Sequence, residues 1–289
     1  MNPVYEKKKS LFQILLALFF IVIIVITLVP ILHILAISFS GKDPIMRGDV
    51  GLLPKEFTLE AYNMVFRNDM IVHSLFFSIF LTIASSFLSI GATILAAYPL
   101  SKSHLKGKTF FLGMITITMY VSAGMVPDYL LIKKLHMLNS IWVLLLPGLI
   151  SAFNLIILRS FFAGINNALF EAAYIDGCGE WKCLFKIAIP LSLPAIFTLT
   201  LFYAVSRWNG ITDVLYYIND SSLYTLQYQL KLMLDTINLP YEHGQIIQQI
   251  TPENVKASTV VFSMVPMLIV YPFVQKYFAQ GVMIGGVKE

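Results

Sequence analysis

The sequence predicts an all-α membrane protein with six transmembrane helices and with both termini in the cytoplasm. Two observations on composition support this fold class: 57% of the 289 residues are hydrophobic, and only 12% are charged. A soluble domain usually carries about a quarter charged residues, so this chain has too little polar surface to cover a globule in water. The third observation is the recurrence of apolar runs near the ~20 residues that a helix needs to cross a bilayer.

The apolar runs define six predicted spans, in order along the chain. They are Leu11–Ile37, Ile71–Leu100, Thr109–Leu131, Ile141–Phe161, Ile187–Ser206 and Ser258–Phe273. The first run follows three lysines and is also compatible with a signal peptide, because Ala36–Ser38 offers a weak cleavage site. Its apolar part is longer than the core of a usual signal peptide, which favours a retained span.

The distribution of basic residues predicts the orientation. With six spans both termini share a side, and that side carries an excess of lysine and arginine, whereas the other side is slightly acidic. The basic residues on the side of the termini are Lys7, Lys8, Lys9, Lys102, Lys106, Lys108, Arg159, Lys182, Lys186, Lys276 and Lys288. Because such an excess stays in the cytoplasm, we expect the termini and the segment 171–186 to be cytoplasmic. The long connections 39–70 and 207–257 are expected outside.

Each outer connection contains a predicted helix. In the first, Thr58 is the expected N-cap and Glu60 lies in the first turn. In the second, apolar residues share one helical face: Leu226, Leu230, Met233, Leu234 and Ile237. This second helix either lies along the membrane surface or a partner protein, or packs on the protein's own spans.

The sequence offers no catalytic, nucleotide-binding or metal-binding motif. Gly107–Thr109 reads GKT, but a phosphate loop also needs a glycine five residues earlier, where Lys102 stands. The five histidines are scattered without metal-ligand spacing. Cys178 and Cys183 are expected to be ordinary thiols in a reducing compartment. We therefore expect no enzyme activity, cofactor or metal in this chain, and the mild net charge of +4 gives no reason to expect nucleic acid.

The predicted span interiors contain no charged side chain, because Asp128, Arg159 and Arg207 all lie at span ends. Charges inside a membrane are retained mainly for function, so their absence argues against a proton relay or a voltage sensor. The polar groups that remain are hydroxyls and amides: Ser78, Thr82, Ser85, Ser86, Ser89, Thr93, Thr116, Thr118, Ser122, Asn154, Thr198 and Thr200. They either join helices to one another or line a path for an uncharged solute.

One charged, glycine-bearing stretch, EAAYIDGCGEWKCLFKIAIPL (Glu171–Leu191), interrupts the apolar sequence. It predicts a helix that begins at Glu171, a turn at Gly177, and then an amphipathic piece. The amphipathic piece contains Trp181, Leu184 and Phe185. Pro190 and Pro194 fall in the first turns of the next span, where proline is tolerated best. The stretch is either a plain cytoplasmic connector or a short helix under the membrane that a soluble partner grips.

The spacing of this stretch resembles the EAA loop of ATP-binding-cassette (ABC) importer permeases. The matching positions are Glu171, Ala172, Ala173, Gly177, Ile187, Ile189 and Pro190. The chain also resembles six-span carbohydrate-uptake permeases of the maltose type, through FTLEAYNMVF, HSLFFSIFLTIASSFLSIGATILAAYPLSK, IDGCGEWKCLFKIAIPLSLPAI, SRWNG and QKYFAQGVMIGGVKE. It departs from them in RWNGITDVLYYIND, which lacks the proline that usually follows the Trp-Asn pair. In this segment the chain is similar to the subgroup that imports oligosaccharides or polysaccharide fragments.

The resemblance implies the transmembrane domain of a type I ABC importer, as a multi-pass subunit in a bacterial cytoplasmic membrane. This chain and a second, homologous but different permease would form the translocation path as a heterodimer. Two cytoplasmic ATPase subunits would bind ATP and Mg²⁺, and an extracellular solute-binding protein would deliver the sugar. By analogy, the ATPase grip is formed by Glu171, Ala172, Ala173, Asp176 and Gly177.

The resemblance also implies an organisation into three parts. Residues 1–70 hold the N-terminal tail, the first span and an outer loop, and residues 71–278 form the importer core. The core includes the EAA loop at about 168–190 and the outer loop at about 207–257, as the motif and the apolar runs place them. Residues 279–289 form a cytoplasmic tail that reaches toward the ATPase interface.

Aromatic faces, amides and hydroxyls bind sugars, which makes a small set of residues candidates for the solute path: Asn154, Trp208, Asn209, Tyr216 and Tyr217. The aromatic members are also explained by an interfacial belt, and in the maltose type the other permease can hold the sugar alone. Two other functions stay open. One is a permease of the same superfamily for a non-sugar solute such as a peptide or a phosphate ester, although a phosphate ester would favour basic residues in the path. The other is a membrane scaffold without a transport role.

Overall fold

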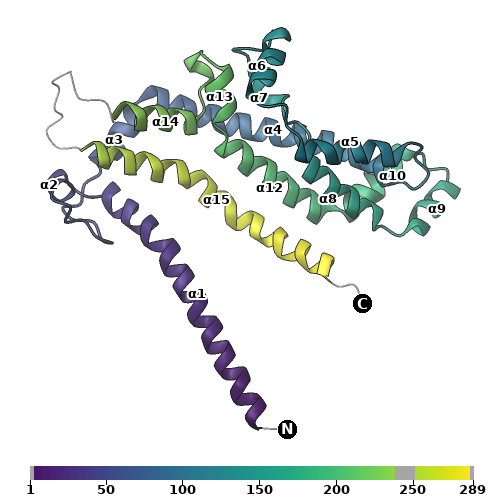
Figure 1. The fold of residues 1–289 in the computed structure, drawn as a ribbon, viewed down its shortest axis with the longest axis horizontal. Helices are drawn as coiled ribbons and strands as arrows, with labels where there is room; N and C mark the ends of the chain where they lie inside the picture. Colours follow the sequence, from purple (N-terminus) through teal and green to yellow (C-terminus); the bar gives the residue numbers. More distant parts are fainter. Residues whose placement is uncertain (1–2, 238–250, 287–289) are drawn as a thin grey trace. The chain divides into compact units, whose positions relative to one another are not determined.

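The computed structural model describes the backbone of residues 3–237 and 251–286, and every regular element in these two ranges is helical (Figure 1). The chain divides into two compact units. The first comprises Met1–Val72 and Leu230–Val265, and the second comprises His73–Gln229 and Pro266–Glu289. The expected all-α fold class is confirmed for the described residues. Parts of the predicted outer loop (238–250) and of the predicted tail (287–289) lie outside them.

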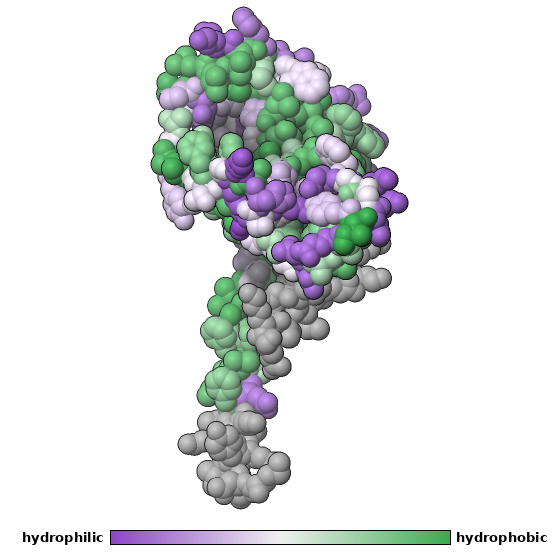
Figure 2. Space-filling view, turned by 90° about the vertical axis from the view of Figure 1, so that its right-hand side faces the viewer, coloured by the Kyte–Doolittle hydropathy of each residue, from purple (hydrophilic) through white to green (hydrophobic). Residues whose placement is uncertain are grey.

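The first unit contains α1 (Pro3–Ser38), α2 (Lys42–Met46), α3 (Glu60–Arg67) and the beginning of α15 (Pro252–Gly286). The segment Phe12–Ser38 of α1 is long and apolar enough to cross a membrane. Its large side chains are exposed along most of this length, and Figure 2 shows their hydrophobic surface in green. A helix that exposes apolar side chains in this way is suited to a lipid environment.

Polar side chains of α15 satisfy the last carbonyl groups of α1. The Asn254 amide donates to the carbonyl oxygens of Ile37 (2.9 Å) and Ser40 (2.8 Å). The Ser258 hydroxyl donates to the carbonyl oxygen of Ser38 at 3.2 Å. Because the last four carbonyl groups of a helix have no partner within it, these bonds fix the end of α1 against the start of α15.

The N-terminus of α3 differs by one residue from the predicted one. Leu59 is the N-cap residue, and it makes no side-chain cap. The Thr58 hydroxyl instead accepts a hydrogen bond from the Glu60 backbone N–H at 3.2 Å, two residues further on. Threonine makes this local turn readily, so the predicted Thr58 cap is wrong although its hydroxyl supports the turn before the helix.

The second unit is built around α4 (Asp69–Ser101), α8 (Ala152–Ala163) and α12 (Leu193–Asn209). Its other helices are α5 (Lys108–Tyr120), α6 (Met125–Lys134), α7 (Ile141–Leu145), α9 (Asn167–Ile175), α10 (Glu180–Cys183), the π-helical turn η1 (Leu184–Ala188), α11 (Ile189–Leu191), α13 (Thr212–Tyr217), η2 (Ser221–Leu223) and α14 (Leu226–Ile237), which continues into the first unit. Helix α8 packs against both α5 and α12. The shared core includes Ala97, Leu158, Phe162, Leu184, Ala188 and Leu199.

Three of the predicted spans are not single straight helices. The axes of α5 and α6 differ by 117°, and the axis of the helical stretch Glu180–Leu191 differs from that of α12 by 82°. The axes of α8 and α9 also differ by 68°, but α9 lies outside the predicted spans. The expectation of one unbroken helix over Thr109–Leu131 is wrong because the chain turns before α6, at Gly124 with φ +89°. Over Ile187–Ser206 the chain bends at Ser192, because Pro194 in the first turn of α12 has no N–H with which to continue the preceding helix.

The predicted span Ile141–Phe161 is divided as well. Its helices α7 and α8 are separated by a turn that contains Pro147 and Gly148, and this glycine has φ +75°. Among the described residues, two helices are long and apolar enough to cross a membrane alone, Phe12–Ser38 and Asp69–Ser101, and the candidates rise to five if each bent pair is one span. Six spans therefore stay a prediction.

Candidate functional site

The helix that carries the EAA sequence, α9, begins earlier than predicted. Asn166 is its N-cap, and its side-chain oxygen accepts a hydrogen bond from the Ala168 backbone N–H at 3.0 Å. Asparagine is among the best N-cap residues, so the helix begins at Asn167 and the predicted start at Glu171 is wrong. Glu171 therefore lies in the middle of α9, one turn after the N-terminus.

Helix α9 leaves most of its surface uncovered by the described residues. Phe170 is its buried anchor, 6% exposed, and Ala173 is partly buried on the same side. Glu171 and Ala172 are exposed, and Ile175 is 87% exposed. A short helix with one buried side chain leaves its exposed acidic and apolar groups available to a partner.

Gly177 ends α9 with a left-handed turn. The Gly177 N–H donates to the Tyr174 carbonyl oxygen at 3.0 Å, and the Cys178 N–H donates to the Ala173 carbonyl oxygen at 2.9 Å. These two bonds form the Schellman motif, which usually places glycine where φ is positive, and Gly177 has φ +76°. A Cβ atom added there would meet no atom within 4 Å. The position thus needs glycine for its backbone conformation and not for a close approach.

The amphipathic piece after this turn has two distinct faces. Leu184 and Cys183 are buried, at 2% and 0% exposed. Trp181 and Phe185 are 65% and 60% exposed, and their rings stack with centroids 6.3 Å apart. Leu184 therefore anchors the piece in the core, whereas the two aromatic rings face away from it.

A polar cleft of about 440 Å³ lies elsewhere in the same unit, between α4, α6, α7, α12 and α13. Its polar lining residues are Ser85, Ser89, Asp128, Tyr203, Ser206, Arg207, Thr212, Asp213, Tyr216 and Tyr217. The hydroxyl of Tyr203 is already engaged, because it bonds to the Thr93 hydroxyl (2.7 Å) and accepts from the Ser151 N–H (3.0 Å). The lining combines hydroxyl groups, phenol rings and two carboxylates with one guanidinium.

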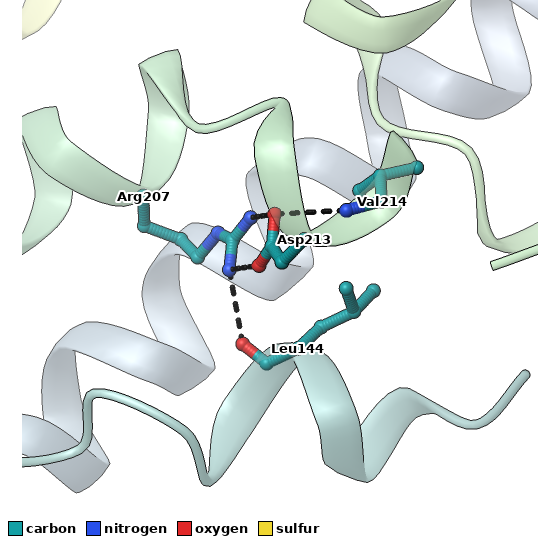
Figure 3. Close-up of polar contacts among 4 residues, drawn as sticks. All are labelled: Leu144, Arg207, Asp213 and Val214. Carbon is teal, nitrogen blue, oxygen red and sulfur yellow. Dashed lines mark hydrogen bonds and ion pairs between the residues drawn. The ribbon is translucent and has the colours of Figure 1, made fainter. Parts of the chain in front are cut away.

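An ion pair between Arg207 and Asp213 closes one wall of the cleft (Figure 3). The Arg207 Nη2 donates to Asp213 Oδ1 at 2.9 Å, and Nη1 donates both to Asp213 Oδ2 and to the carbonyl oxygen of Leu144, the latter at 3.0 Å. The two side chains are only 11% and 23% exposed. This two-pronged, charge-assisted pairing is a strong one, and it ties the end of α12 to α13 and α7.

Asp128 is the other acidic group of the cleft lining. It is exposed and forms no ion pair with any residue that the structure describes. Burial raises the pKa of Tyr217, and the nearby negative charges of Asp128 and Asp213 raise this pKa further. Since Arg207 balances Asp213, the described lining presents the negative charge of Asp128 beside two phenol rings.

Comparison with known proteins assigns the chain to a family. The model of the family described as "Binding-protein-dependent transport system inner membrane component" matches residues 9–284. The chain belongs to this family. Its members are transporter subunits and not enzymes.

Two relatives and one solved structure match nearly the whole chain. Protein LplC of Bacillus subtilis is 40% identical over 265 residues, which cover 91% of this chain and 90% of LplC. The polygalacturonan/rhamnogalacturonan transport system permease protein YtcP of Bacillus subtilis is 38% identical over 284 residues, which cover 97% of this chain and 99% of YtcP. The crystal structure of a bacterial ABC transporter involved in the import of the acidic polysaccharide alginate contains a chain that is 33% identical, with a TM-score of 0.89, and the match covers 96% of this chain and 100% of that chain.

In this inner membrane component, the residues predicted for the ATPase grip lie together. Glu171, Ala172 and Ala173 are consecutive on α9, and Asp176 and Gly177 form its C-terminal turn. Their roles in gripping an ATPase stay a prediction.

Two of the five residues predicted for the solute path line the polar cleft, and three do not. Tyr216 and Tyr217 line the polar cleft. Trp208 and Asn154 are buried, at 4% and 5% exposed, and they are not among the lining residues. Asn209 is exposed and its amide donates to the Val205 carbonyl oxygen at 2.9 Å, also away from the lining. Contact between these five residues and a solute stays a prediction.

Sequence reasoning did not single out the three charged lining residues as parts of one site. The sequence places Asp128 and Arg207 at the ends of predicted spans, and it gives Asp213 no role. Only the spacing of Arg207 and Asp213 around Gly210 offered a local signal, because a break in the helix can turn the chain back toward its own last turn. The placement of Arg207 and Asp213 beside α6 and α7 depends on packing between elements distant in the sequence, and no local pattern predicts that packing.

Proposed function

We propose that this chain is one permease subunit of an ATP-driven, binding-protein-dependent importer of oligosaccharides. The observation that carries the proposal is the uncovered helix α9 with its Schellman turn at Gly177, in a chain that belongs to a family of binding-protein-dependent inner membrane components. A helix with one buried anchor and an exposed remainder is the form that a separate subunit can grip.

The proposed complex gives each of the two candidate surfaces a partner or a solute. Two cytoplasmic ATPase subunits bind ATP and Mg²⁺, and one of them holds α9. A second, different permease completes the translocation path, and a solute-binding protein delivers the sugar from outside. The chain crosses the bacterial cytoplasmic membrane six times with both termini in the cytoplasm, and α9 lies on the cytoplasmic side, after the crossing to which α8 belongs.

The chemistry of the polar cleft supports a sugar as the solute. Phenol rings such as Tyr216 and Tyr217 offer flat apolar faces, and Ser85, Ser89 and Thr212 offer hydroxyls for hydrogen bonds. The names of the similar proteins point the same way, because YtcP is named for polygalacturonan and rhamnogalacturonan and the solved structure for alginate. A peptide remains the second candidate for the solute, since hydroxyl groups and phenol rings also bind peptides.

Reconstitution tests the proposal. The chain is placed in liposomes with its partner permease, the ATPase and the binding protein, and labelled oligosaccharide or labelled oligopeptide is offered outside. We expect uptake of the oligosaccharide, dependent on internal ATP and on the binding protein, and unchanged when the proton gradient is collapsed. Uptake of the peptide alone would contradict the sugar assignment and keep the importer. Uptake without ATP, driven by a pH gradient, would contradict the importer as well.

A further inference from the structure

Glu180, the first residue of α10, joins three elements of the second unit. Its carboxylate accepts a hydrogen bond from the Tyr98 hydroxyl on Oε2 and another from the Tyr174 hydroxyl on Oε1, each at 2.8 Å. Tyr98 lies near the C-terminal end of α4, and Tyr174 lies in the last turn of α9. One side chain thus connects α4, α9 and α10.

Lys102 strengthens the same cluster from the end of α4. Its ammonium group lies 3.5 Å from the centroid of the Phe170 ring and 4.7 Å from that of Tyr98, and it donates to the Tyr174 hydroxyl at 3.3 Å. Cations are attracted to aromatic faces at such distances. Burial lowers the pKa of Lys102, and the negative charge of Glu180 opposes this shift. We call Tyr98, Lys102, Tyr174 and Glu180 the Glu180 cluster.

Apolar packing beside the Glu180 cluster is incomplete. A cavity of about 370 Å³ lies there, with Leu95 and Pro99 of α4 on one side and Trp181 and Leu184 on the other. A cavity removes contacts that would otherwise hold two surfaces together. The polar contacts of the cluster therefore add to the apolar packing of Tyr98, Phe170 and Leu184 in connecting α4 with the segment that contains α9 and α10.

Helix α4 also reaches the polar cleft, where Ser85 and Ser89 belong to the lining. Ser89 and Tyr98 are nine residues apart on one continuous helix, which corresponds to about 13 Å along its axis. A displacement of the end of α4 is therefore transmitted to the cleft by a rigid element.

We propose that the Glu180 cluster is a positioning device that makes α4 move together with α9, so that movement of the ATPase subunits changes the polar cleft. This inference rests on the proposed function. It assigns to Tyr98, Tyr174 and Glu180 a role distinct from the grip itself, since none of them needs to touch the ATPase. Without the cluster, the ATPase still holds α9 and still hydrolyses ATP, but α4 follows this movement less closely, through apolar packing alone.

The test uses the reconstituted importer with Tyr98→Phe, Tyr174→Phe and the double variant, which remove one hydroxyl each and keep the rings. Tyr224→Phe is the matched control, because its hydroxyl bonds to the Asn219 carbonyl oxygen outside the cluster. We expect each single variant to copurify with the ATPase and hydrolyse ATP normally. The number of solute molecules imported per ATP should fall by about tenfold in Tyr98→Phe, the factor for one hydrogen bond to a charged group, and further in Tyr174→Phe, which also loses the bond from Lys102. A coupled pair should also lose less in the double variant than the two single losses combined.

A second readout needs no solute. In a chain with Cys178 and Cys183 replaced by alanine, Ser85→Cys places a thiol in the cleft, and its labelling rate is measured in the assembled complex with and without ATP. We expect ATP to change this rate with native tyrosines and to change it much less with Tyr98→Phe or Tyr174→Phe. An ATP response and an import ratio that both stay unchanged in these variants would overturn the positioning role. Failure of the native complex to import any oligosaccharide, with the ATP response of the thiol still dependent on the tyrosines, would overturn only the proposed substrate.

Discussion

The EAA helix and the polar cleft belong to the same compact unit, yet they are held in opposite ways. Helix α9 has one buried anchor, Phe170, and keeps its other side chains largely exposed. The cleft wall is fixed from within, because Arg207 bonds to Asp213 and to the Leu144 carbonyl oxygen. The difference shows that the exposed helix α9 is determined by local sequence, whereas the polar cleft is assembled by contacts between distant elements.

A labelling experiment with an all-or-none result tests the predicted orientation, in which α9 faces the cytoplasm. A wrong orientation would remove α9 from the comparison as an ATPase contact. We expect an impermeant thiol reagent to label Asp49→Cys in sealed cells and not Lys106→Cys, in a chain without its two native cysteines. Both substituted positions label in opened membranes, which serves as the control. Labelling of Lys106→Cys in sealed cells would reverse the orientation and remove the ATPase from the side of α9.

Removal of one member of the Arg207–Asp213 pair should have the largest effect on stability. Arg207→Ala leaves a mostly buried carboxylate without its partner, which costs about 3 kcal/mol in comparable cases. We expect a clear fall in the unfolding temperature of the purified protein and loss of uptake. Lys231→Ala, at an exposed pair with Asp235, is the control and should cost less than about 1 kcal/mol. Equal effects of the two substitutions would show that the cleft is not held by its ion pair.

Substitution of Gly177 should separate docking from stability. Gly177→Val forces a β-branched residue to φ +76°, at a cost of roughly 1–3 kcal/mol, while no membrane helix is touched. We expect normal insertion, weaker copurification with the ATPase and reduced uptake. Gly179→Ala is the control, because Gly179 has φ −80° and open space around it. A Gly177→Val protein that assembles and imports normally would refute the docking role of this turn.

The smallest effect concerns Asp128 in the cleft. Two charges about 4 Å apart in a watery site interact by about 1 kcal/mol, or roughly fivefold in a rate. We therefore expect Asp128→Asn to raise uptake of an acidic oligosaccharide by up to about fivefold and to leave uptake of a neutral one unchanged. Comparable changes for both sugars would mean that Asp128 acts through folding and not through its charge.

The two regions also differ in how far the sequence predicts them. The turn at Gly177 was predictable because its hydrogen bonds join residues within five positions of one another. The start of α9 was misplaced because Asn166, a strong N-cap, lies upstream of the motif that drew attention to Glu171. Both features are local, and a search for caps on each side of the motif would have corrected the second.

The cleft was less predictable for a physical reason. Trp208 has the residue type expected of a sugar contact, but it is buried because it lies on the face of α12 that packs into the protein. The pairing of Arg207 with Asp213 requires the chain to fold back after Gly210 and requires α7 to present its carbonyl group. The breaks at Gly124, Gly148 and Ser192 redirect the predicted spans, and hydropathy alone does not register a change of direction.

The bonds between α15 and the end of α1 have a consequence for the synthesis of the protein. Ile37 and Asn254, which meet in one hydrogen bond, are 217 residues apart in the sequence. At about 5–20 residues per second, a ribosome needs roughly 10–40 s to make the intervening chain. During that interval the first helix leaves the ribosome and waits with its last carbonyl groups unmatched by α15. The first unit is thus completed only when translation is nearly over, and nascent chains that stop before residue 252 keep an unfinished first unit.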